Sequence, residues 1–285
     1  PELYFQTKLY TGNGGTQSIT LDGSENMQPD WVWIKSRNNS GVNGNHFVQD
    51  SVRGATKSII TNITAAEFTQ TNMVTSFDSD GFSLGNEDEF NRSGTTFVSW
   101  NWKAGGSASS NSNGSITSSV SASTDAGFSI VSYTGTGSDA NVGHGLSSAP
   151  ELIITKSRST TGDWKVHTSA IDGSWDVGTL NSTSAFGNSS YTASTNSIFY
   201  VGSGAPTNAS SVTYVSYLLH SVKGYSKFGS YTGNGSLDAP FIHLGFKPAW
   251  LMIKRTDTTN SWVMFDNKRN AFNVVDKHLF ANTTD

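Results

Sequence analysis

The sequence contains no cysteine, which excludes disulfide bonds, thiolate zinc sites and cysteine nucleophiles. Charged residues make up only 14% of the chain, against roughly 25% in an average protein. The formal net charge is −4, and a nucleic-acid partner would require a concentrated basic surface, so none is expected. No apolar run approaches the roughly 18 residues of a membrane span, so we expect no membrane insertion.

Aromatic residues, by contrast, reach 12%, with 8 Trp and 16 Phe. Most of the polarity comes from Ser, Thr, Asn and Gly, which suit strands, turns and exposed loops. The composition therefore predicts cores built largely from rings and connected by polar turns.

One short motif occurs three times, as YTGNG from Tyr10, YTGTG from Tyr133 and YTGNG from Tyr231. Two further sets of segments follow it in the same order. The first set is PDWVWIK from Pro29, PELIITK from Pro150 and PAWLMIK from Pro248. The second set is HFVQDSVRG from His46, DWKVHTSA from Asp163 and SWVMFDNKRN from Ser261. Matching segments in a fixed order predict a tandem array.

The boundaries of the array follow from these segments. Repeat 1 spans 1–104, a Gly/Ser/Asn-rich flexible linker spans 105–115, repeat 2 spans 116–224, and a partial repeat 3 spans 225–285. Repeats 1 and 2 close with TTFVSWNWKAG and VTYVSYLLHSVKG, and the third copy stops before such a segment. For that early stop, we favour a clipped or incompletely traced chain over a repeat that lacks its second half.

Apolar residues alternate with polar ones inside the repeats, as in Val98, Trp100 and Trp102 against Ser99 and Asn101. This period of two is that of a β-strand. Large residues at alternate positions of the segments from Pro29, Pro150 and Pro248 predict one wall of each core; they are Trp31 and Trp33, Leu152 and Ile154, and Trp250 and Met252. The expected fold class is all-β, made of tandem β-sandwich or jelly-roll repeats. The best helical signal, a capping-box pattern over 64–67, predicts a turn or two at most.

The motifs YTGNG, PDWVWIKSR, DSVRGATK, TSFDSDGF, GFSIVSYTGTG and GYSKFGSYTGNG together resemble repeats of structural proteins from marine tailed bacteriophages. Such proteins are commonly tail-fibre or other virion proteins with concanavalin A-like, lectin/glucanase-type jelly rolls. The resemblance covers nearly the whole chain. It implies a virion location and an all-β sandwich, and it transfers no ligand site.

Enzymatic activity is not expected. Glucanases of this fold use paired carboxylates, and Glu87 and Glu89 would share a face if GNEDEFN formed a strand. A charged hairpin tip explains the same residues, and repeat 2 has no such cluster. The six histidines show no metal-ligand spacing, and neither a nucleophile elbow nor a phosphate loop is present. A polysaccharide depolymerase is therefore only a distant third hypothesis.

A calcium site is a weak alternative in the stretch DSDG, where Asp78 and Asp80 resemble part of a calcium loop. A β-turn explains these residues equally well. No other cofactor is expected.

A glycan platform is a second weak alternative, with Trp100, Trp102 or Trp164 stacking beneath a sugar, although a core position explains each ring more simply. The pairs Asp50 with Arg53 and Asp266 with Arg269 are expected to brace turns. Several Asn-Xaa-Ser/Thr triplets, including those at 62, 181 and 208, are expected by chance in a chain of this composition.

Two functions from different classes remain. The first is a non-enzymatic virion component, part of a tail fibre or a capsid decoration, whose partners are other virion proteins and further copies of the chain. The second is a lectin-like module that attaches the phage to host-surface glycans. An exposed aromatic cluster among polar side chains would favour glycan binding, whereas an apolar flank or a free sheet edge would favour assembly.

Overall fold

The computed structural model describes residues 1–39 and 41–285. The all-β prediction is confirmed, because antiparallel sheets make up nearly all of the regular structure. Within the described residues only two four-residue helices occur, α1 (Asp88–Asn91) and α2 (Ala205–Asn208). None of the helices in this part of the chain has the length and apolar character needed to cross a membrane.

Repeat 1 is a sandwich of a six-stranded sheet, in the order β1-β9-β3-β4-β5-β6, and a three-stranded sheet, β2-β8-β7. The strands of the large sheet are β1 (Phe5–Thr11), β9 (Thr96–Trp102), β3 (Trp31–Ser36), β4 (His46–Asp50), β5 (Lys57–Ile60) and β6 (Phe68–Thr69). Those of the small sheet are β2 (Gln17–Thr20), β8 (Gly81–Leu84) and β7 (Val74–Asp78).

Repeat 2 has the same plan, with a sheet in the order β10-β11-β12-β19-β14-β15-β16-β17 packed against the pair β13-β18. The strands of the large sheet are β10 (Ser109–Asn111), β11 (Ser118–Ser123), β12 (Phe128–Thr134), β19 (Thr213–Leu219), β14 (Leu152–Ser157), β15 (Lys165–Thr168), β16 (Asp176–Thr179) and β17 (Gly187–Asn188). The small pair is β13 (Ala140–Gly143) and β18 (Ile198–Val201).

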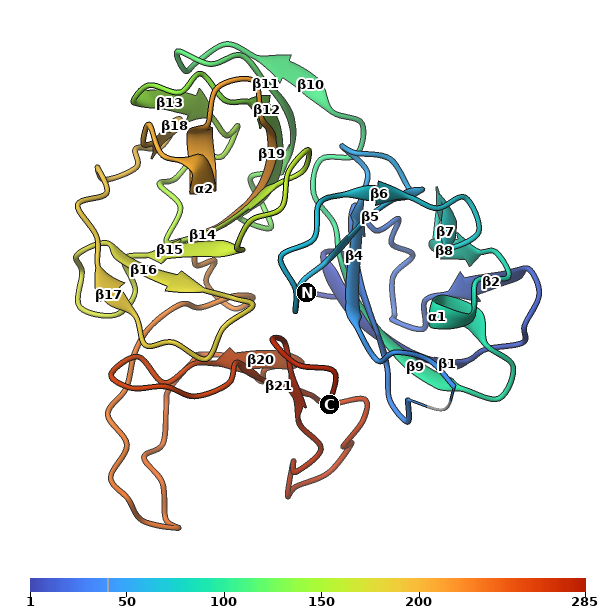
Figure 1. The fold of residues 1–285 in the computed structure, drawn as a ribbon. Coiled ribbons are helices and arrows are strands. Elements are labelled where there is room, and N and C mark those ends of the chain that lie inside the picture. Colours follow the sequence, from blue (N-terminus) through green and yellow to red (C-terminus); the bar gives the residue numbers. More distant parts are fainter. Residues whose placement is uncertain (40) are drawn as a thin grey trace.

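Repeat 3 contributes one three-stranded sheet, β20 (Trp250–Ile253), β21 (Val263–Asp266) and β22 (Leu279–Phe280). Its strands correspond to β3-β4-β5 and to β14-β15-β16, because the pairing registers coincide. Trp31 lies opposite Asp50, Leu152 opposite Thr168, and Trp250 opposite Asp266. The three sheets surround a common centre, with repeat 1 at right, repeat 2 at upper left and repeat 3 at the bottom (Figure 1).

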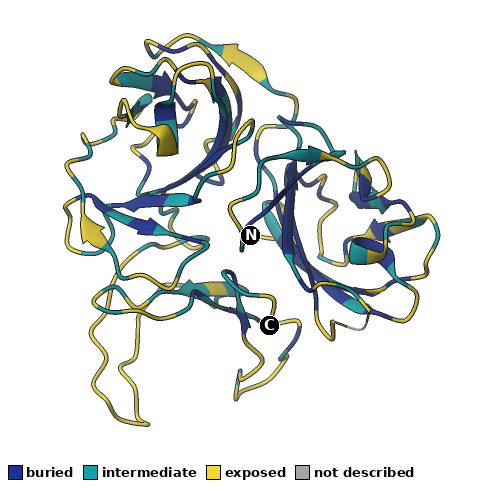
Figure 2. Ribbon diagram, in the orientation of Figure 1, coloured by how far each residue is buried: buried dark blue, intermediate teal, exposed yellow. Residues whose placement is uncertain are grey.

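Strand β3 is buried at every position, a pattern that alternation toward one core would not give. Trp31 and Trp33 point into a core shared by all three repeats, while Val32 and Ile34 point into the sandwich of repeat 1. The large sheets are therefore covered on both faces, and dark blue runs through their middle strands in Figure 2. The sandwich of repeat 2 has its own cluster, which includes Tyr133 and Phe199.

Two local predictions are wrong. Residues 64–67 form no helix, because the carboxylate of Glu67 binds Arg53 and Arg158 and does not cap a turn. The segment 105–115 is not a free linker, because β10 pairs with β11. Its start is also held by Asp30, whose Oδ2 accepts hydrogen bonds from the amides of Ala104 and Gly106.

The YTGNG motif of repeat 1 and the YTGTG motif of repeat 2 each form a glycine turn around a buried asparagine, Asn91 or Asn208. The hydroxyl of Tyr10 donates to the backbone oxygen of Phe90 at 2.9 Å, and Gly14 donates to the backbone oxygen of Asn91 at 2.7 Å. Tyr133 and Gly137 make the corresponding bonds in repeat 2. The motif is thus a docking element for a helix that follows far along the chain.

Candidate functional site: the contacts that join the repeats

The shared core is a stack of rings contributed by neighbouring repeats. Trp31 of repeat 1 stacks on Tyr217 of repeat 2, with ring centroids 4.4 Å apart and planes 21° from parallel. Trp31 also lies 4.5 Å from Trp102 in its own repeat. On the other side of repeat 1, Trp102 meets Trp250 of repeat 3 edge-on at 5.4 Å. Rings in these geometries contribute beyond their buried area.

One hydrogen bond recurs at corresponding positions of two repeat boundaries. The indole nitrogen of Trp164 donates to the backbone oxygen of Ile60 at 2.8 Å, and that of Trp262 donates to Thr179 at 3.0 Å. Each bond satisfies a buried donor and a strand-end carbonyl at once. Each also joins one repeat to the preceding one.

His46 holds the corresponding position in repeat 1. Its Nδ1 accepts a hydrogen bond of 2.9 Å from the indole of Trp33, and its ring interacts with the backbone of Phe280 in repeat 3. Phe280 corresponds to Ile60 and Thr179, so the same contact closes the ring of three repeats, although Nε2 of His46 forms no well-aligned hydrogen bond there. Burial, and then the charges of Lys35 and Arg269, hold the pKa of His46 well below its ordinary value, and the ring is neutral.

At each of the three repeat boundaries, a lysine of one repeat donates a hydrogen bond to a backbone oxygen of the neighbouring repeat. Lys156 donates to the backbone oxygen of Thr64 at 3.3 Å, Lys254 to Thr183 at 3.3 Å, and Lys35 to Thr284 at 3.0 Å. Each ammonium also binds the carbonyl of the residue that follows it. Burial lowers the pKa of Lys35 and of Lys156 to about 8, because desolvation penalises the charged form.

A charged cluster lies between repeats 1 and 2. Asp50 and Arg53 form a fully buried ion pair, and the hydroxyl of Tyr217 donates to Oδ2 of Asp50 at 2.7 Å. Glu67 binds Arg53 at 3.1 Å and accepts a two-pronged contact from Arg158 of repeat 2, at 2.9 and 3.0 Å. Burial raises the pKa of Glu67, but hydrogen bonds and charge from the two arginines outweigh it and leave this pKa below the ordinary value.

The corresponding cluster between repeats 3 and 1 is simpler. Asp266 and Arg269 pair as Asp50 and Arg53 do, and the indole of Trp100 donates to Oδ2 of Asp266 at 3.1 Å. The guanidinium of Arg269 also lies over the Trp100 ring, 5.8 Å from its centroid. These ion pairs do brace their turns, since Oδ1 of each aspartate accepts the backbone amide of its arginine. They also bind the neighbouring repeat, which was not predicted.

The glycan platform is not supported. Trp100 and Trp164 are 0% exposed and Trp102 is 6% exposed, all within the shared core. A ring without an exposed face cannot stack on a sugar, so the core interpretation of these three residues holds.

The structure places no calcium ligand set around Asp78 and Asp80. The carboxylate oxygens of Asp78 accept hydrogen bonds from Ser76 and Ser83, and Oδ1 of Asp80 accepts one from the amide of Met27. No group of three or more acidic or histidine side chains fit for a metal occurs in residues 1–39 or 41–285.

Glu87 and Glu89 do not share a strand face. Glu87 precedes helix α1 as its N-cap, and Glu89 lies in the first turn of that helix. Each also has a structural partner, because Glu87 accepts from Gln70 and Glu89 accepts from the backbone and side chain of Asn43. A paired-carboxylate catalyst would need a different arrangement.

The Asn-Xaa-Thr triplets were the overlooked signal for these boundaries. Oδ1 of Asn62, Asn181 and Asn282 accepts the backbone amide of His46, Trp164 and Trp262, respectively, at 2.8–2.9 Å. The threonine two residues later supplies the carbonyl that binds the lysine. The triplet therefore serves two of the contacts that join the repeats, and its recurrence at the same place in each repeat is no coincidence of composition.

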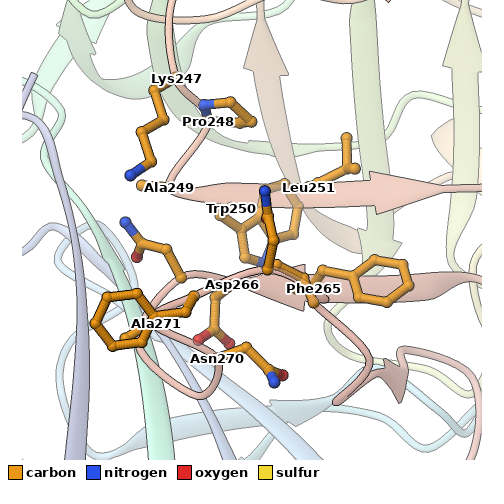
Figure 3. A pocket seen from close by; sticks show the side chains of 13 residues that line it. Lys247, Pro248, Ala249, Trp250, Leu251, Phe265, Asp266, Asn270 and Ala271 are labelled. Carbon is orange, nitrogen blue, oxygen red and sulfur yellow. The ribbon is translucent and has the colours of Figure 1, made fainter. Parts of the chain in front are cut away.

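A cavity of about 580 Å³ lies beside the start of β20, between that strand, β21 and the loop after β21 (Figure 3). Its apolar lining includes Trp250, Leu251 and Phe265. The one carboxylate that lines it, Asp266, is already paired with Arg269. Among the described residues, the lining of the cavity is thus mainly apolar.

These sheets and contacts define an all-β protein in which antiparallel sandwiches close around a shared aromatic core. The chain belongs to the family described as domain of unknown function DUF7483, which matches residues 1–285. No curated protein and no solved structure matches the chain.

Proposed function

We propose that the chain is a non-enzymatic structural component of a bacteriophage virion, in a tail fibre or a capsid decoration, built from concanavalin A-like jelly-roll repeats. The proposal takes the virion location from the sequence resemblance. The observation that carries the structural role is the contrast between the repeat boundaries and the surface of repeat 3. Aromatic and charged side chains are buried at the boundaries, whereas repeat 3 leaves a sheet edge and apolar side chains exposed.

The exposed apolar surface is concentrated in one part of the chain. Apart from Leu3 and Ile63, the exposed large hydrophobic residues in the described part of the chain all lie in repeat 3; they are Tyr231, Leu237, Phe241, Ile242, Leu251, Phe272 and Val274. The long loop that carries several of them is the yellow extension at the bottom of Figure 2. An apolar flank beside a free edge favours assembly with further protein.

Mass spectrometry of purified phage particles tests the virion role. The proposal expects peptides of this chain in particles after density-gradient purification, at a copy number typical of structural proteins. A chain that is abundant in the infected cell and missing from the particle would contradict it.

Attachment to host glycans is the alternative, and it now depends on other aromatic residues. Tyr231 and Phe241 are 51% and 88% exposed, in a loop that contains several Gly and Ser residues. Binding of the chain to a panel of bacterial surface polysaccharides tests this role. Saturable binding that is lost in a Tyr231→Ala variant would establish it, and silence across the panel would leave the structural role.

A further inference from the structure

In repeats 1 and 2, one strand occupies the middle of the large sheet. Strand β9 pairs with both β1 and β3, and β19 pairs with both β12 and β14. Repeat 3 contains the counterpart of β3, which is β20, and the counterpart of β1, which is the segment 226–232 that leads into its YTGNG motif. Within residues 1–39 and 41–285, no strand lies between them, and β20 is the edge of its sheet.

The open edge of β20 presents the backbone donors that bind this middle strand elsewhere. The amides of Asp30 and Glu151 donate to the carbonyls of Trp102 and Leu219, each at 2.8 Å. Ala249 holds the corresponding position in repeat 3. At the other end, Arg37 and Arg158 donate to the carbonyls of Thr96 and Thr213 at 2.7 Å, and Thr256 corresponds to them.

Neither the amide of Ala249 nor that of Thr256 donates a hydrogen bond within the described part of the chain. The carbonyls of the same two residues are already used, by Asn267 and Phe186. The edge is therefore anchored on its inner side and free on its outer side, which is the condition for adding a strand.

In both complete repeats, large side chains of the middle strand point toward the shared core. Trp100 and Trp102 of β9 face the shared core, as do Tyr217 and Leu219 of β19. Their counterparts in repeat 3 would lie opposite Met252 and Trp250, which already line that core. We call the space that the side chains of one middle strand occupy in the shared core a wedge. Strands β9 and β19 fill two of the three wedges, and within the described residues the third, beside Met252 and Trp250, is open.

Trp100 donates a hydrogen bond to Asp266, and Tyr217, at the corresponding position, donates one to Asp50. In each case the carboxylate belongs to the preceding repeat around the centre, where repeat 3 precedes repeat 1. The preceding repeat for the open wedge is repeat 2, where Thr168 takes the place of Asp50. Asp176 pairs with Thr168 on the next strand. Asp176 is 5% exposed, and its Oδ2 has no hydrogen-bond partner in the part of the chain that the structure describes.

The third copy of the motif has the same sequence as the first, YTGNG, but different surroundings. Tyr10 and Tyr133 are buried beside the middle strand of their repeats, at 8% and 4% exposure, whereas Tyr231 is 51% exposed. An identical sequence that stays in solvent indicates that its binding partner is missing from the described residues.

We propose that the open edge of β20 is a binding site for a polypeptide strand with the alternating pattern of β9 and β19. The strand lies antiparallel to β20, its carbonyls accept the amides of Ala249 and Thr256, and its aromatic residues fill the third wedge of the shared core. The site does not depend on the virion location, because its occupant is defined by the other two repeats; the open edge itself is also one of the observations that support the structural role.

A synthetic peptide with the sequence TTFVSWNWKAG, residues 95–105, tests this site. We expect one peptide to bind per chain, and we expect amide hydrogen exchange at Ala249 and Thr256 to slow in the complex. The variant Ala249→Pro lacks one of the two donors, and it should weaken binding about tenfold or more. Ala249→Gly keeps the amide and is the matched control, and a peptide of the same composition in scrambled order should not bind.

Three results would overturn the proposal. The peptide fails to bind although exchange shows β20 and β21 paired, or it binds Ala249→Pro and Ala249→Gly equally well, or the chain forms a dimer that occupies the edge and excludes the peptide. Thr256→Pro repeats the test at the other end of the strand if Ala249→Pro disturbs the sheet. Particle composition remains the separate test of the virion role.

Discussion

The indole nitrogen of Trp164 donates a hydrogen bond of 2.8 Å to the backbone oxygen of Ile60, more than a hundred residues away and in a different repeat. The same contact, from Trp262 to Thr179, joins the next two repeats. The bond from Trp164 is fully buried and the one from Trp262 is partly buried, so loss of the Trp164 donor leaves a buried carbonyl without its partner. Stability of the whole chain should therefore depend on single side chains at the boundaries.

Trp164→Phe should destabilise the chain by about 1–3 kcal/mol, because the ring is kept and the donor to Ile60 is lost. Trp164→Ala should cost about 3–5 kcal/mol, since it also leaves a cavity. Urea unfolding followed by fluorescence measures both. Trp175→Phe is the matched control, because Trp175 packs only in the sandwich of repeat 2, and its cost should stay below about 1 kcal/mol. Equal losses at 164 and 175 would contradict a role for the boundary bond.

Tyr217→Phe should cost about 1–3 kcal/mol, because it removes the hydroxyl that donates to the buried carboxylate of Asp50. Tyr200→Phe is the control, since the Tyr200 side chain is only partly buried in β18 and its hydroxyl makes no side-chain hydrogen bond within the described residues. Thermal unfolding of the parent and of both variants measures the loss of stability in each. A Tyr217→Phe protein as stable as the parent would show that the charged cluster does not need this donor.

The free energy of unfolding should rise with pH in mildly alkaline solution, because Lys35 and Lys156 are buried. Burial lowers the pKa of Lys35 and Lys156 from 10.5 to about 8, so above pH 8 the unfolded chain binds more protons than the folded chain. Stability then increases with pH up to about pH 10, by at most about 3 kcal/mol for each lysine. Urea midpoints at pH 7, 8, 9 and 10 measure the slope. Lys156→Met should reduce it, and an unchanged slope in that variant would refute the assignment.

The chain should lose stability in acid when Glu67 is protonated. Its pKa lies below the ordinary 4.5, because the hydrogen bonds and charges of Arg158 and Arg53 outweigh the effect of burial. A carboxyl with a lowered folded pKa stabilises the protein above the unfolded value, and this contribution disappears as pH falls through the folded pKa. Glu67→Gln should therefore be less stable than the parent at pH 7, with the gap closing below pH 4.5. Glu25→Gln, on the exposed surface, should show no such convergence.

Calcium should not change the stability of the chain. A ligand that binds only the folded state raises the melting temperature, and both carboxylate oxygens of Asp78 and Oδ1 of Asp80 already accept hydrogen bonds. Melting curves with millimolar calcium and with EDTA are expected to coincide. A calcium-dependent rise that Asp78→Asn removes would restore the metal site.

Much of the fold could be predicted from alternation and repetition. The segments from Pro29, Pro150 and Pro248 gave three strands in matching registers, and the ends of repeats 1 and 2 gave β9 and β19. The capping-box pattern failed because the carboxylate of Glu67 has stronger partners in Arg53 and Arg158. Local propensity carries no information about such distant partners.

The contacts between the repeats could not be read from the sequence. Nothing in the alternation of Trp31 and Trp33 distinguishes a wall of a single sandwich from a wall of a core shared by three repeats. His46 occupies the position of Trp164 and Trp262, so residue identity also conceals the correspondence. The Asn-Xaa-Thr triplets at 62, 181 and 282 were the visible sign, and they acquire meaning only beside the amides and lysines that they bind.

Equilibrium unfolding of residues 1–104 beside the whole chain tests most directly whether the three repeats form one core. In the whole chain, Trp31, Trp33 and Trp100 are covered by repeats 2 and 3, and the isolated fragment would expose them. We expect a single cooperative transition for the whole chain, and a fragment that unfolds at much lower denaturant or aggregates. A soluble fragment as stable as the intact chain would show that each repeat is a domain in its own right and would contradict the shared core.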